Sequence, residues 1–455
     1  MTDDVGYRAR MGALLRSTAN DLKRNSAAAS KDLGLSEAEY QDLVNGRQEI
    51  SGTALAAISR SWPVNERDIL PIHNDCPDGV LRVAVEDSVV SARVLPRGGA
   101  DYYEYRDTAM SRLASFRPEW IRMLAVVDDD DPDNPAVQWN NGHLLYQFTY
   151  FVGPVNYYYR WAGRSHVLRM RTGDSIWGLP FSPHTFTARN ADEPAYILAL
   201  TYGGELTGDA RHELAALGLG TSRKYAMAAA GQAVPARPRM RSFLDAASMS
   251  VDELARRTGW PAGRVVELVD GGLTPSGDEL VVLADALRVS VRDLLPIGID
   301  SPNDICLVRA TDARRWPHPS SDREDYTVTE LAGNRMHPHT RAMEIRPHRE
   351  NGDVGDALIT YQHQYLYNVG SDPLVMRWEH AGQAHRTVLR PGDSAYVMPF
   401  VPCAYGIEGT PDHPRLLALR INGSVTAEVR TALGAMHPGG LERMLHEDRP
   451  WYREG

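Results

Sequence analysis

Two histidines and a glutamine have the spacing of a metal site. His143 is followed four residues later by Gln147 in NNGHLLYQ, and His184 follows a GDS turn in RTGDSIWGLPFSPHTF. Even spacing along a strand places side chains on one face, so we expect His143 to open a strand that also carries Gln147. Non-haem iron binds both O₂ and substrate when its ligands leave coordination positions open. We therefore predict an Fe(II) site made of His143, Gln147 and His184.

The predicted ligand set has a neutral amide, Gln147, where a carboxylate is the usual iron ligand. An amide oxygen is a weaker donor and leaves the metal with one more unit of positive charge. The alternative is that each histidine is simply packed or solvated, which is common for a lone histidine. Two histidines with a polar third residue favour the metal site.

Side chains suited to binding an oxyanion lie near this set. RGGADYYEY contains Arg97, Tyr103 and Tyr105, Asn140 lies three residues before His143, and Lys23 stands near the end of a long predicted helix. A guanidinium and a phenol are what an anion such as a phosphonate requires. Each residue also has a plain alternative, because Arg97 can be a surface residue, the tyrosines core and Lys23 a solvated helix end.

The sequence repeats itself. RDILPI at 67–72 recurs as RDLLPI at 292–297, and RTGDSIWGLPFSPHTF at 171–186 recurs as RPGDSAYVMPFVPCAY at 390–405. Two matches in the same order indicate two copies of a unit of roughly 200 residues. The Ala- and Pro-rich stretch 226–240 is predicted to link them.

The second copy has lost the histidines. The repeat places Thr360 opposite His143 and Cys403 opposite His184, whereas Gln364 still matches Gln147 and has His363 beside it. We therefore predict that the second copy is structural. The alternative is a weak site that uses His363.

Each copy begins with a helical part. Ser36 and Glu39 predict a capping box before one helix, as do Ser250 and Glu253 in the second copy. Short helices separated by tight glycine turns resemble a helix-turn-helix module of about five helices.

The second part of each copy changes to short alternating runs, over about 80–205 and 305–425. Many short strands with frequent turns predict a sandwich or barrel, and the GDS turn followed by P-x-x-P-H is typical of cupin barrels. The expected fold class is α+β, a duplicated unit of a helical module and a cupin (double-stranded β-helix). The expected boundaries are 1–75 for the first helical module, 76–222 for the catalytic cupin, 223–240 for the linker, 241–300 for the second module and 301–455 for the degenerate cupin.

Composition narrows the class of protein. The 455 residues carry a net charge of −10, which argues against a general nucleic-acid or anionic-membrane partner. The three cysteines, Cys76, Cys306 and Cys403, are widely spaced and suit a reducing compartment. No stretch approaches the ~18 apolar residues of a membrane span, and the N-terminus lacks a signal-peptide pattern. We expect a soluble cytoplasmic protein, and a homo-oligomer is compatible with the sequence.

The order of these motifs resembles the phosphonate-processing iron oxygenases, which comprise hydroxypropylphosphonate epoxidase, hydroxyethylphosphonate dioxygenase and methylphosphonate synthase. For the last two the resemblance spans essentially the whole chain. It implies that Lys23, Arg97, Tyr105 and Asn140 hold the phosphonate group, with Tyr103 and His184 also at the substrate and with Tyr105 and Lys23 in catalytic roles. The ligand set of two histidines and a glutamine is that of the synthase.

The resemblance implies Fe(II)- and O₂-dependent cleavage of the C–C bond of 2-hydroxyethylphosphonate without 2-oxoglutarate. The synthase outcome is methylphosphonate and bicarbonate; the dioxygenase outcome is hydroxymethylphosphonate and formate. Gly178 stands where the dioxygenase has its carboxylate ligand and the synthase a bulky aliphatic residue, and Leu144 stands where the synthase has an aromatic. These departures leave the product open.

Two other classes compete. A helix-turn-helix module fused to a cupin is also the layout of transcriptional regulators, but SEAEYQDLVNG has three acids and no base, and PAGRVVELVDGG one Arg against two acids. The third class is a metal-independent isomerase or a sugar-binding bicupin. The acidic run 128–131 is interpreted as a solvated loop rather than a cation site.

Overall fold

The computed structural model describes residues 4–230, 237–270, 273–295 and 305–446. It mixes helices and sheets, as predicted, and the paired strands of each sheet are antiparallel. Two compact units are present, one made of residues 1–202, 303–333 and 339–455, the other of 203–302 and 334–338. No helix among the described residues is both long and apolar enough to span a bilayer.

The N-terminal helices are α1 (Asp4–Asp21), α2 (Ser26–Leu33), α3 (Glu37–Val44) and α4 (Gly52–Ser61), followed by the 3₁₀ turn η1 (Glu66–Asp68). The predicted capping box of Ser36 and Glu39 is present at the start of α3. It satisfies backbone N–H groups that have no partner within the helix. Leu15, Ile58 and Trp62 lie in the core that these helices share.

A second group of helices lies in the other compact unit. It contains the 3₁₀ turn η2 (Gly204–Leu206), α6 (Asp209–Ala216), α7 (Gly218–Ala230), α8 (Arg237–Ala246), α9 (Val251–Thr258), α10 (Ala262–Asp270), α11 (Gly277–Leu287) and α12 (Val291–Leu294). Ser250 accepts a hydrogen bond from the Glu253 N–H, which is half of the predicted capping box. The Glu253 carboxylate instead binds Arg256 and Arg257. The stretch predicted as a linker is therefore helical at both ends, and residues 231–236 lie outside the described residues.

The first barrel is built from a seven-stranded sheet of order β11-β8-β5-β10-β4-β3-β2 and a three-stranded sheet of order β7-β6-β9. The strands are β2 (Arg93–Arg97), β3 (Ala100–Asp107), β4 (Phe116–Met123), β5 (Tyr146–Val152), β6 (Val155–Trp161), β7 (Arg164–Met170), β8 (Ser175–Gly178), β9 (His184–Ala188), β10 (Tyr196–Tyr202) and β11 (Ile305–Val308).

The second barrel has the same layout. Its seven-stranded sheet has the order β1-β18-β15-β20-β14-β13-β12, and its smaller sheet β17-β16-β19. The strands are β1 (Val80–Val83), β12 (Arg315–Ser320), β13 (Arg323–Glu330), β14 (Arg341–Pro347), β15 (His363–Asn368), β16 (Leu374–His380), β17 (Gln383–Leu389), β18 (Ser394–Val397), β19 (Cys403–Ile407) and β20 (Leu416–Ile421). The short helix α5 (Val85–Val90) follows β1, and α13 (Ala427–Gly434) and α14 (Pro438–His446) follow β20.

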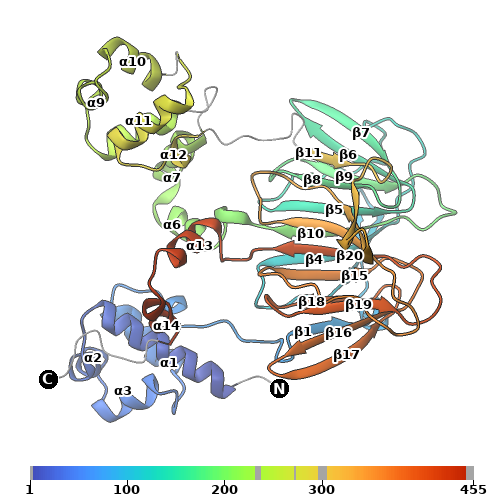
Figure 1. The fold of residues 1–455 in the computed structure, drawn as a ribbon, viewed down its shortest axis with the longest axis horizontal. Helices are drawn as coiled ribbons and strands as arrows, with labels where there is room; N and C mark the ends of the chain where they lie inside the picture. The colour runs from blue at the N-terminus through green and yellow to red at the C-terminus, as the bar shows by residue number, and fades with distance from the viewer. Residues whose placement is uncertain (1–3, 231–236, 271–272, 296–304, 447–455) are drawn as a thin grey trace. The chain divides into compact units, whose positions relative to one another are not determined.

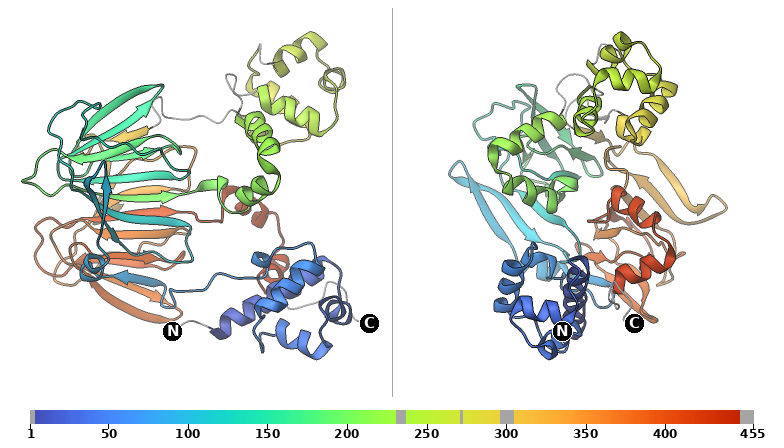
Figure 2. Two further views of the ribbon diagram at one scale, coloured as in Figure 1. Left: turned by 180° about the vertical axis from the view of Figure 1, so that it is seen from behind. Right: turned by 90° about the vertical axis from the view of Figure 1, so that its left-hand side faces the viewer.

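The two barrels exchange edge strands, as Figures 1 and 2 show for β1 and β11. β1 comes before the first barrel in sequence but pairs with β18, and β11 comes before the second barrel but pairs with β8. The Asp of each repeated GDS turn forms an ion pair with an arginine that follows or belongs to the exchanged strand. Arg309 lies 2.7 Å from Asp174, and Arg82 lies 2.5 Å from Asp393. Both barrels consequently lie in one compact unit.

Candidate metal centre

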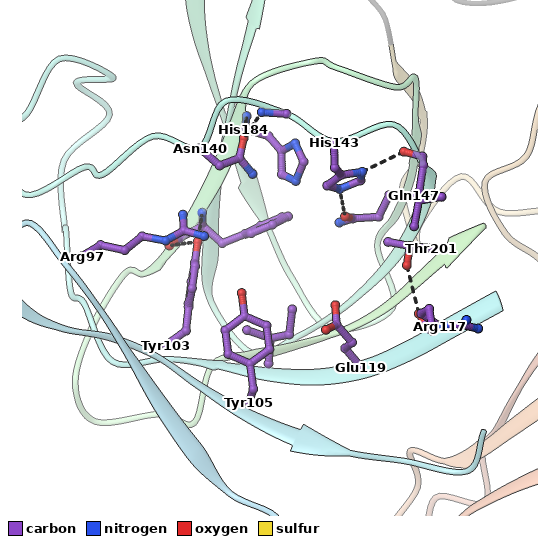
Figure 3. A pocket seen from close by; sticks show the side chains of 14 residues that line it. Arg97, Tyr103, Tyr105, Arg117, Glu119, Asn140, His143, Gln147, His184 and Thr201 are labelled. Carbon is purple, nitrogen blue, oxygen red and sulfur yellow. Dashed lines mark hydrogen bonds between the residues drawn. The ribbon is translucent and has the colours of Figure 1, made fainter. Parts of the chain in front are cut away.

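A cavity of about 450 Å³ lies inside the first barrel (Figure 3). Its walls come from β2, β3, β4, β5, β9, β10 and the loop before β5. The residues that line it are Arg97, Tyr103, Tyr105, Arg117, Glu119, Ile121, Asn140, Gly142, His143, Leu145, Gln147, His184, Phe186 and Thr201. The cavity thus brings together the three predicted metal ligands. It also contains four of the five other residues that were predicted to contact the phosphonate.

His143 lies in the loop before β5 and not at the opening of a strand, so that prediction was wrong. The His143 carbonyl accepts a 2.7 Å hydrogen bond from the Phe181 N–H, which ties the loop to the segment before His184 instead of to a strand. Gly142 permits this arrangement because its φ is +72° and a Cβ there would lie 2.5 Å from the Phe181 carbonyl carbon. The His143 and Gln147 side chains nevertheless meet as predicted.

The His143 ring and the Gln147 amide face each other across a short distance. His143 Nδ1 lies 2.9 Å from the Leu145 carbonyl, so a neutral ring carries its proton on Nδ1. His143 Nε2 then faces Gln147 Oε1 at 3.0 Å with a lone pair, and this amide is oriented because its Nε2 donates to Thr149 Oγ1 at 2.8 Å. Two opposed lone pairs are the arrangement that a cation between them stabilises.

His184 completes the set at the start of β9. Its Nδ1 lies 2.8 Å from the Ser182 carbonyl, which leaves Nε2 free of its proton, and its ring is 5.3 Å from that of His143. Burial lowers the pKa of His184 to about 4, so the ring is neutral near pH 7. Histidines whose second nitrogen donates to a carbonyl are typical metal ligands. These donors therefore fit a divalent metal ion.

The amide of Gln147 is needed for any such site. Among the described residues, no cluster of three or more His, Cys, Asp or Glu side chains could hold a metal ion. The position paired with Gln147 across the strands is Gly178, where an added Cβ would meet no atom within 4 Å. The space beside the amide is therefore open to a ligand.

Arg97, Tyr105 and Asn140, which are predicted to contact the phosphonate, all line the cavity (Figure 3). Arg97 lies against the Tyr103 ring, with its guanidinium carbon 4.7 Å from the ring centre. Asn140 Oδ1 accepts from the N–H groups of His184 and Gly142 at 2.9 Å each, which turns its amide nitrogen toward the cavity. Burial raises the pKa of Tyr105 and the Arg97 charge opposes this, so the phenol keeps its proton and can donate.

Tyr103 lines the cavity, but its hydroxyl is engaged by β9. It accepts from the Phe186 N–H at 2.8 Å and lies 2.9 Å from Thr185 Oγ1. Burial raises the pKa of Tyr103 well above its ordinary value. The ring therefore supports Arg97, and the hydroxyl holds the strand that carries His184.

Lys23 is not among the residues that line the cavity. It lies two residues beyond the end of α1, with φ of 57°, and its Nζ donates to the Asn20 carbonyl at 3.2 Å. Its predicted contact with the phosphonate stays a prediction.

Three polar residues of the cavity were missed by the sequence reasoning: Arg117 and Glu119 on β4, and Thr201 on β10. Burial raises the pKa of Glu119, while Arg93 and His143 lower it. Arg117, Glu119 and Ile121 are spaced two residues apart and so share one face of the strand. This spacing was the sequence signal that could have grouped them.

In the second barrel the corresponding positions hold no such set. His363 and Gln364 are neighbours on β15 and so face opposite sides of the sheet. His363 Nδ1 lies 2.7 Å from the Tyr396 hydroxyl, while Gln364 Oε1 accepts from Arg420 Nε at 2.9 Å. A site that combines His363 with Gln364 is therefore not formed.

Comparison with known proteins agrees with this geometry. The chain is 37% identical over 448 residues, 98% of its length and 96% of the relative's, to a methylphosphonate synthase of Nitrosopumilus maritimus. The chain belongs to the methylphosphonate synthase and hydroxyethylphosphonate dioxygenase family. It is also 50% identical to the hydroxyethylphosphonate dioxygenase of Streptomyces albus, solved with 2-hydroxyethylphosphonate and Fe(II) bound, with a TM-score of 0.92 over 99% of this chain and 100% of that one.

More distant matches concern the fold and the helices. A structure of a hydroxyethylphosphonate dioxygenase mutant has 19% identity and a TM-score of 0.74 over 95% of this chain and 99% of that one. Residues 239–297 match the model for the Cro/C1-type HTH DNA-binding domain. The predicted helix-turn-helix character of the second helical group is thus confirmed.

Proposed function

We propose that the chain cleaves the C–C bond of 2-hydroxyethylphosphonate with O₂ at an Fe(II) ion held by His143, Gln147 and His184. The observation that carries this is the facing pair of donors, His143 Nε2 and Gln147 Oε1, which lie 3.0 Å apart in a cavity that Arg97 also lines. The family relationship indicates the reaction class. One relative is a methylphosphonate synthase, and the other is a hydroxyethylphosphonate dioxygenase with substrate and Fe(II) bound.

The protein's own residues bind and orient the substrate. Arg97 is a fixed cation and Tyr105 a protonated phenol, so together with the Asn140 amide they bind the phosphonate oxygens. The hydroxyl end then lies toward His143 and Gln147. Bound Fe(II) supplies the oxygen chemistry, and the chain's contribution is to hold the reacting carbon in a fixed position.

The proposed products are methylphosphonate and bicarbonate, in line with the synthase relative. The reaction balances without a further reductant, because all four electrons that O₂ takes up come from the substrate. Hydroxymethylphosphonate and formate are the second candidate, favoured by the 50% identity to the Streptomyces albus enzyme. Both outcomes start from the same bound substrate.

We also propose that the chain is a duplication, with the second barrel retained for structure. The two seven-stranded sheets share one strand order, and each contributes an edge strand to the other. The proposed domains keep the predicted boundaries, with modules over 1–75 and 241–300, barrels over 76–222 and 301–455, and a linker over 223–240. The proposal also includes a cytoplasmic location, a phosphonate and O₂ as small-molecule partners, and neither nucleic acid nor a membrane. A homo-oligomer is compatible with it.

DNA binding is the competing function, favoured by the helix-turn-helix match over 239–297. Within α10 the single base, Arg264, is bound by Glu279, and Glu267 and Asp270 lie on the same helix. A helix that reads DNA needs free cations for the phosphates. A salt-dependent gel shift with genomic DNA fragments distinguishes the two functions.

The deciding experiment is anaerobic loading with Fe(II), addition of 2-hydroxyethylphosphonate, and then exposure to air. We expect substrate-dependent O₂ uptake and a new phosphonate signal by ³¹P NMR, whose shift identifies the product. Metal-loaded protein that takes up no O₂ with this substrate contradicts the proposal.

A further inference from the structure

Glu119 is the one acid among the fourteen described residues that line the cavity. It comes from β4, and its carboxylate points into the cavity toward the side where His143 and Gln147 lie (Figure 3). Among the described residues the Glu119 carboxylate makes no direct hydrogen bond or ion pair, although the charge of Arg93 lowers its pKa. A half-buried carboxylate without such a partner is costly unless something else in the cavity offsets its charge.

The candidate ligands leave a charge uncompensated. His143, Gln147 and His184 are all neutral donors when they bind a divalent ion, so none of them offsets its charge. Non-haem Fe(II) sites in oxygenases usually include one carboxylate ligand beside two histidines. Here the ligand position is an amide, and a carboxylate is instead found on β4, two strands away in the same sheet.

The second barrel serves as an internal control, because its strand register matches that of the first. In the first barrel Gln147 pairs with Thr201, which pairs with Arg117, and Glu119 lies two residues further along β4. In the second barrel Gln364 pairs with Arg420, which pairs with Arg341. The residue two positions beyond Arg341 is Met343. The carboxylate is therefore absent from the barrel that lacks the two histidines.

The second barrel has a cation of its own at this place. Arg420 stands where the first barrel has Thr201, and its Nε donates to Gln364 Oε1 at 2.9 Å. The amide oxygen that faces His143 in the first barrel is thus bound to a guanidinium in the second. The Gln364 amide oxygen therefore has a guanidinium partner, whereas the Gln147 amide oxygen faces His143 Nε2, and Glu119 occurs only in the first barrel.

We propose that Glu119 is the counter-charge of the metal ion, moved from the ligand position on β5 to β4, two strands away in the same sheet. It acts as a positioning residue, because its carboxylate accepts a hydrogen bond from a metal-bound water or hydroxyl group and lowers the free energy of the bound ion. The inference rests on the proposed function, since it requires the metal site. It accounts for a ligand set with no charged member.

The test measures metal affinity and not turnover. Anaerobic titration with Co(II) against a competing chelator, read by the d–d absorption, gives the Kd for the full-length protein. We expect Glu119→Gln and Glu119→Met to weaken Co(II) binding by about 10- to 100-fold, the range typical of residues just outside a ligand set. Glu193→Gln, which removes an exposed loop acid, should leave the Kd unchanged. Glu119→Met copies the second barrel, so the question stays testable if one variant fails to fold.

A compensating change separates charge from local structure. Adding Gln147→Glu to Glu119→Gln returns one carboxylate to the cavity at the ligand position and should restore the affinity to within about tenfold of wild type. A double variant no tighter than Glu119→Gln alone overturns the inference. So does either single variant that binds Co(II) as tightly as wild type. Wild-type protein that binds no Co(II) contradicts the proposed function itself and not merely the role of Glu119.

Discussion

The Tyr103 hydroxyl accepts a 2.8 Å hydrogen bond from the backbone N–H of Phe186, two residues beyond His184. This contact ties β3 to β9 directly behind a predicted metal ligand. It also separates the roles of two tyrosines that lie two residues apart on β3 and line one cavity.

Tyr103→Phe and Tyr105→Phe should therefore have different effects. Removing the Tyr103 hydroxyl leaves the buried Phe186 N–H without its partner, so we expect a loss of about 1–3 kcal/mol in the free energy of unfolding. Removing the Tyr105 hydroxyl takes a donor from the substrate and should raise KM by about tenfold with little change in stability. Urea unfolding and substrate-dependent O₂ uptake measure the two effects, and an equal loss of stability in both variants contradicts this assignment.

Arg97 should be required for phosphonate binding, and lysine should not replace it. Its guanidinium lies over the Tyr103 ring and has a planar set of donors, whereas an ammonium offers a single point charge. We expect Arg97→Lys to raise KM by about 10-fold and Arg97→Ala by about 100-fold or more. The control is Arg164→Ala, an exposed arginine on β7. An unchanged KM in Arg97→Ala would falsify the placement of the phosphonate.

Gly142 and Gly163 form a matched pair for testing the loop that carries His143. Both have positive φ, +72° and +76°, but an added Cβ meets the Phe181 backbone only at Gly142 and finds open space at Gly163. We expect Gly163→Ala to cost about 1 kcal/mol of stability through backbone strain alone. Gly142→Ala should cost more and also weaken Co(II) binding, because the loop must shift. Equal losses in the two variants would mean that the Phe181 contact is unimportant.

The sequence predicts much of the site because its residues lie in regular patterns. His184 begins β9 after the GDS turn, and Gln147 lies on β5 as expected. His143 was assigned to a strand because spacing alone cannot reveal that its carbonyl pairs with Phe181 across a loop. That contact depends on a chain segment almost forty residues away.

Glu119 and the exchanged strands could not be predicted for a related reason. The alternation in FRPEWIRM places Glu119 and Trp120 on opposite faces, but only the pairing of β4 with β10 and β3 decides which face lines the cavity. Likewise, β1 and β11 have the pattern of ordinary first strands of their own barrels. Their pairing with β18 and β8 is a long-range choice that local propensity does not encode.

His363 should make the folded protein sensitive to acid. Burial lowers the pKa of His363 to about 4, below its ordinary value of 6.5, so the folded state holds this ring neutral. In the unfolded chain His363 becomes protonated below about pH 6.5, whereas in the folded state it becomes protonated only near pH 4. Stability is therefore fully present above pH 6.5 and is lost as the pH falls from 6.5 to about 4, by about 2–3 kcal/mol from this group.

His363→Gln should remove that part of the pH dependence, because glutamine does not titrate. The variant also loses the 2.7 Å contact between His363 Nδ1 and the Tyr396 hydroxyl, so its stability at pH 7.5 should be lower than that of wild type. The difference between the two proteins should then shrink as the pH approaches 4. His413→Gln is the control, since the His413 side chain is 76% exposed. Urea unfolding between pH 4 and 7.5 provides the measurement. Parallel curves for wild type and His363→Gln would mean that His363 is accessible to protons in the folded state despite its contact with Tyr396.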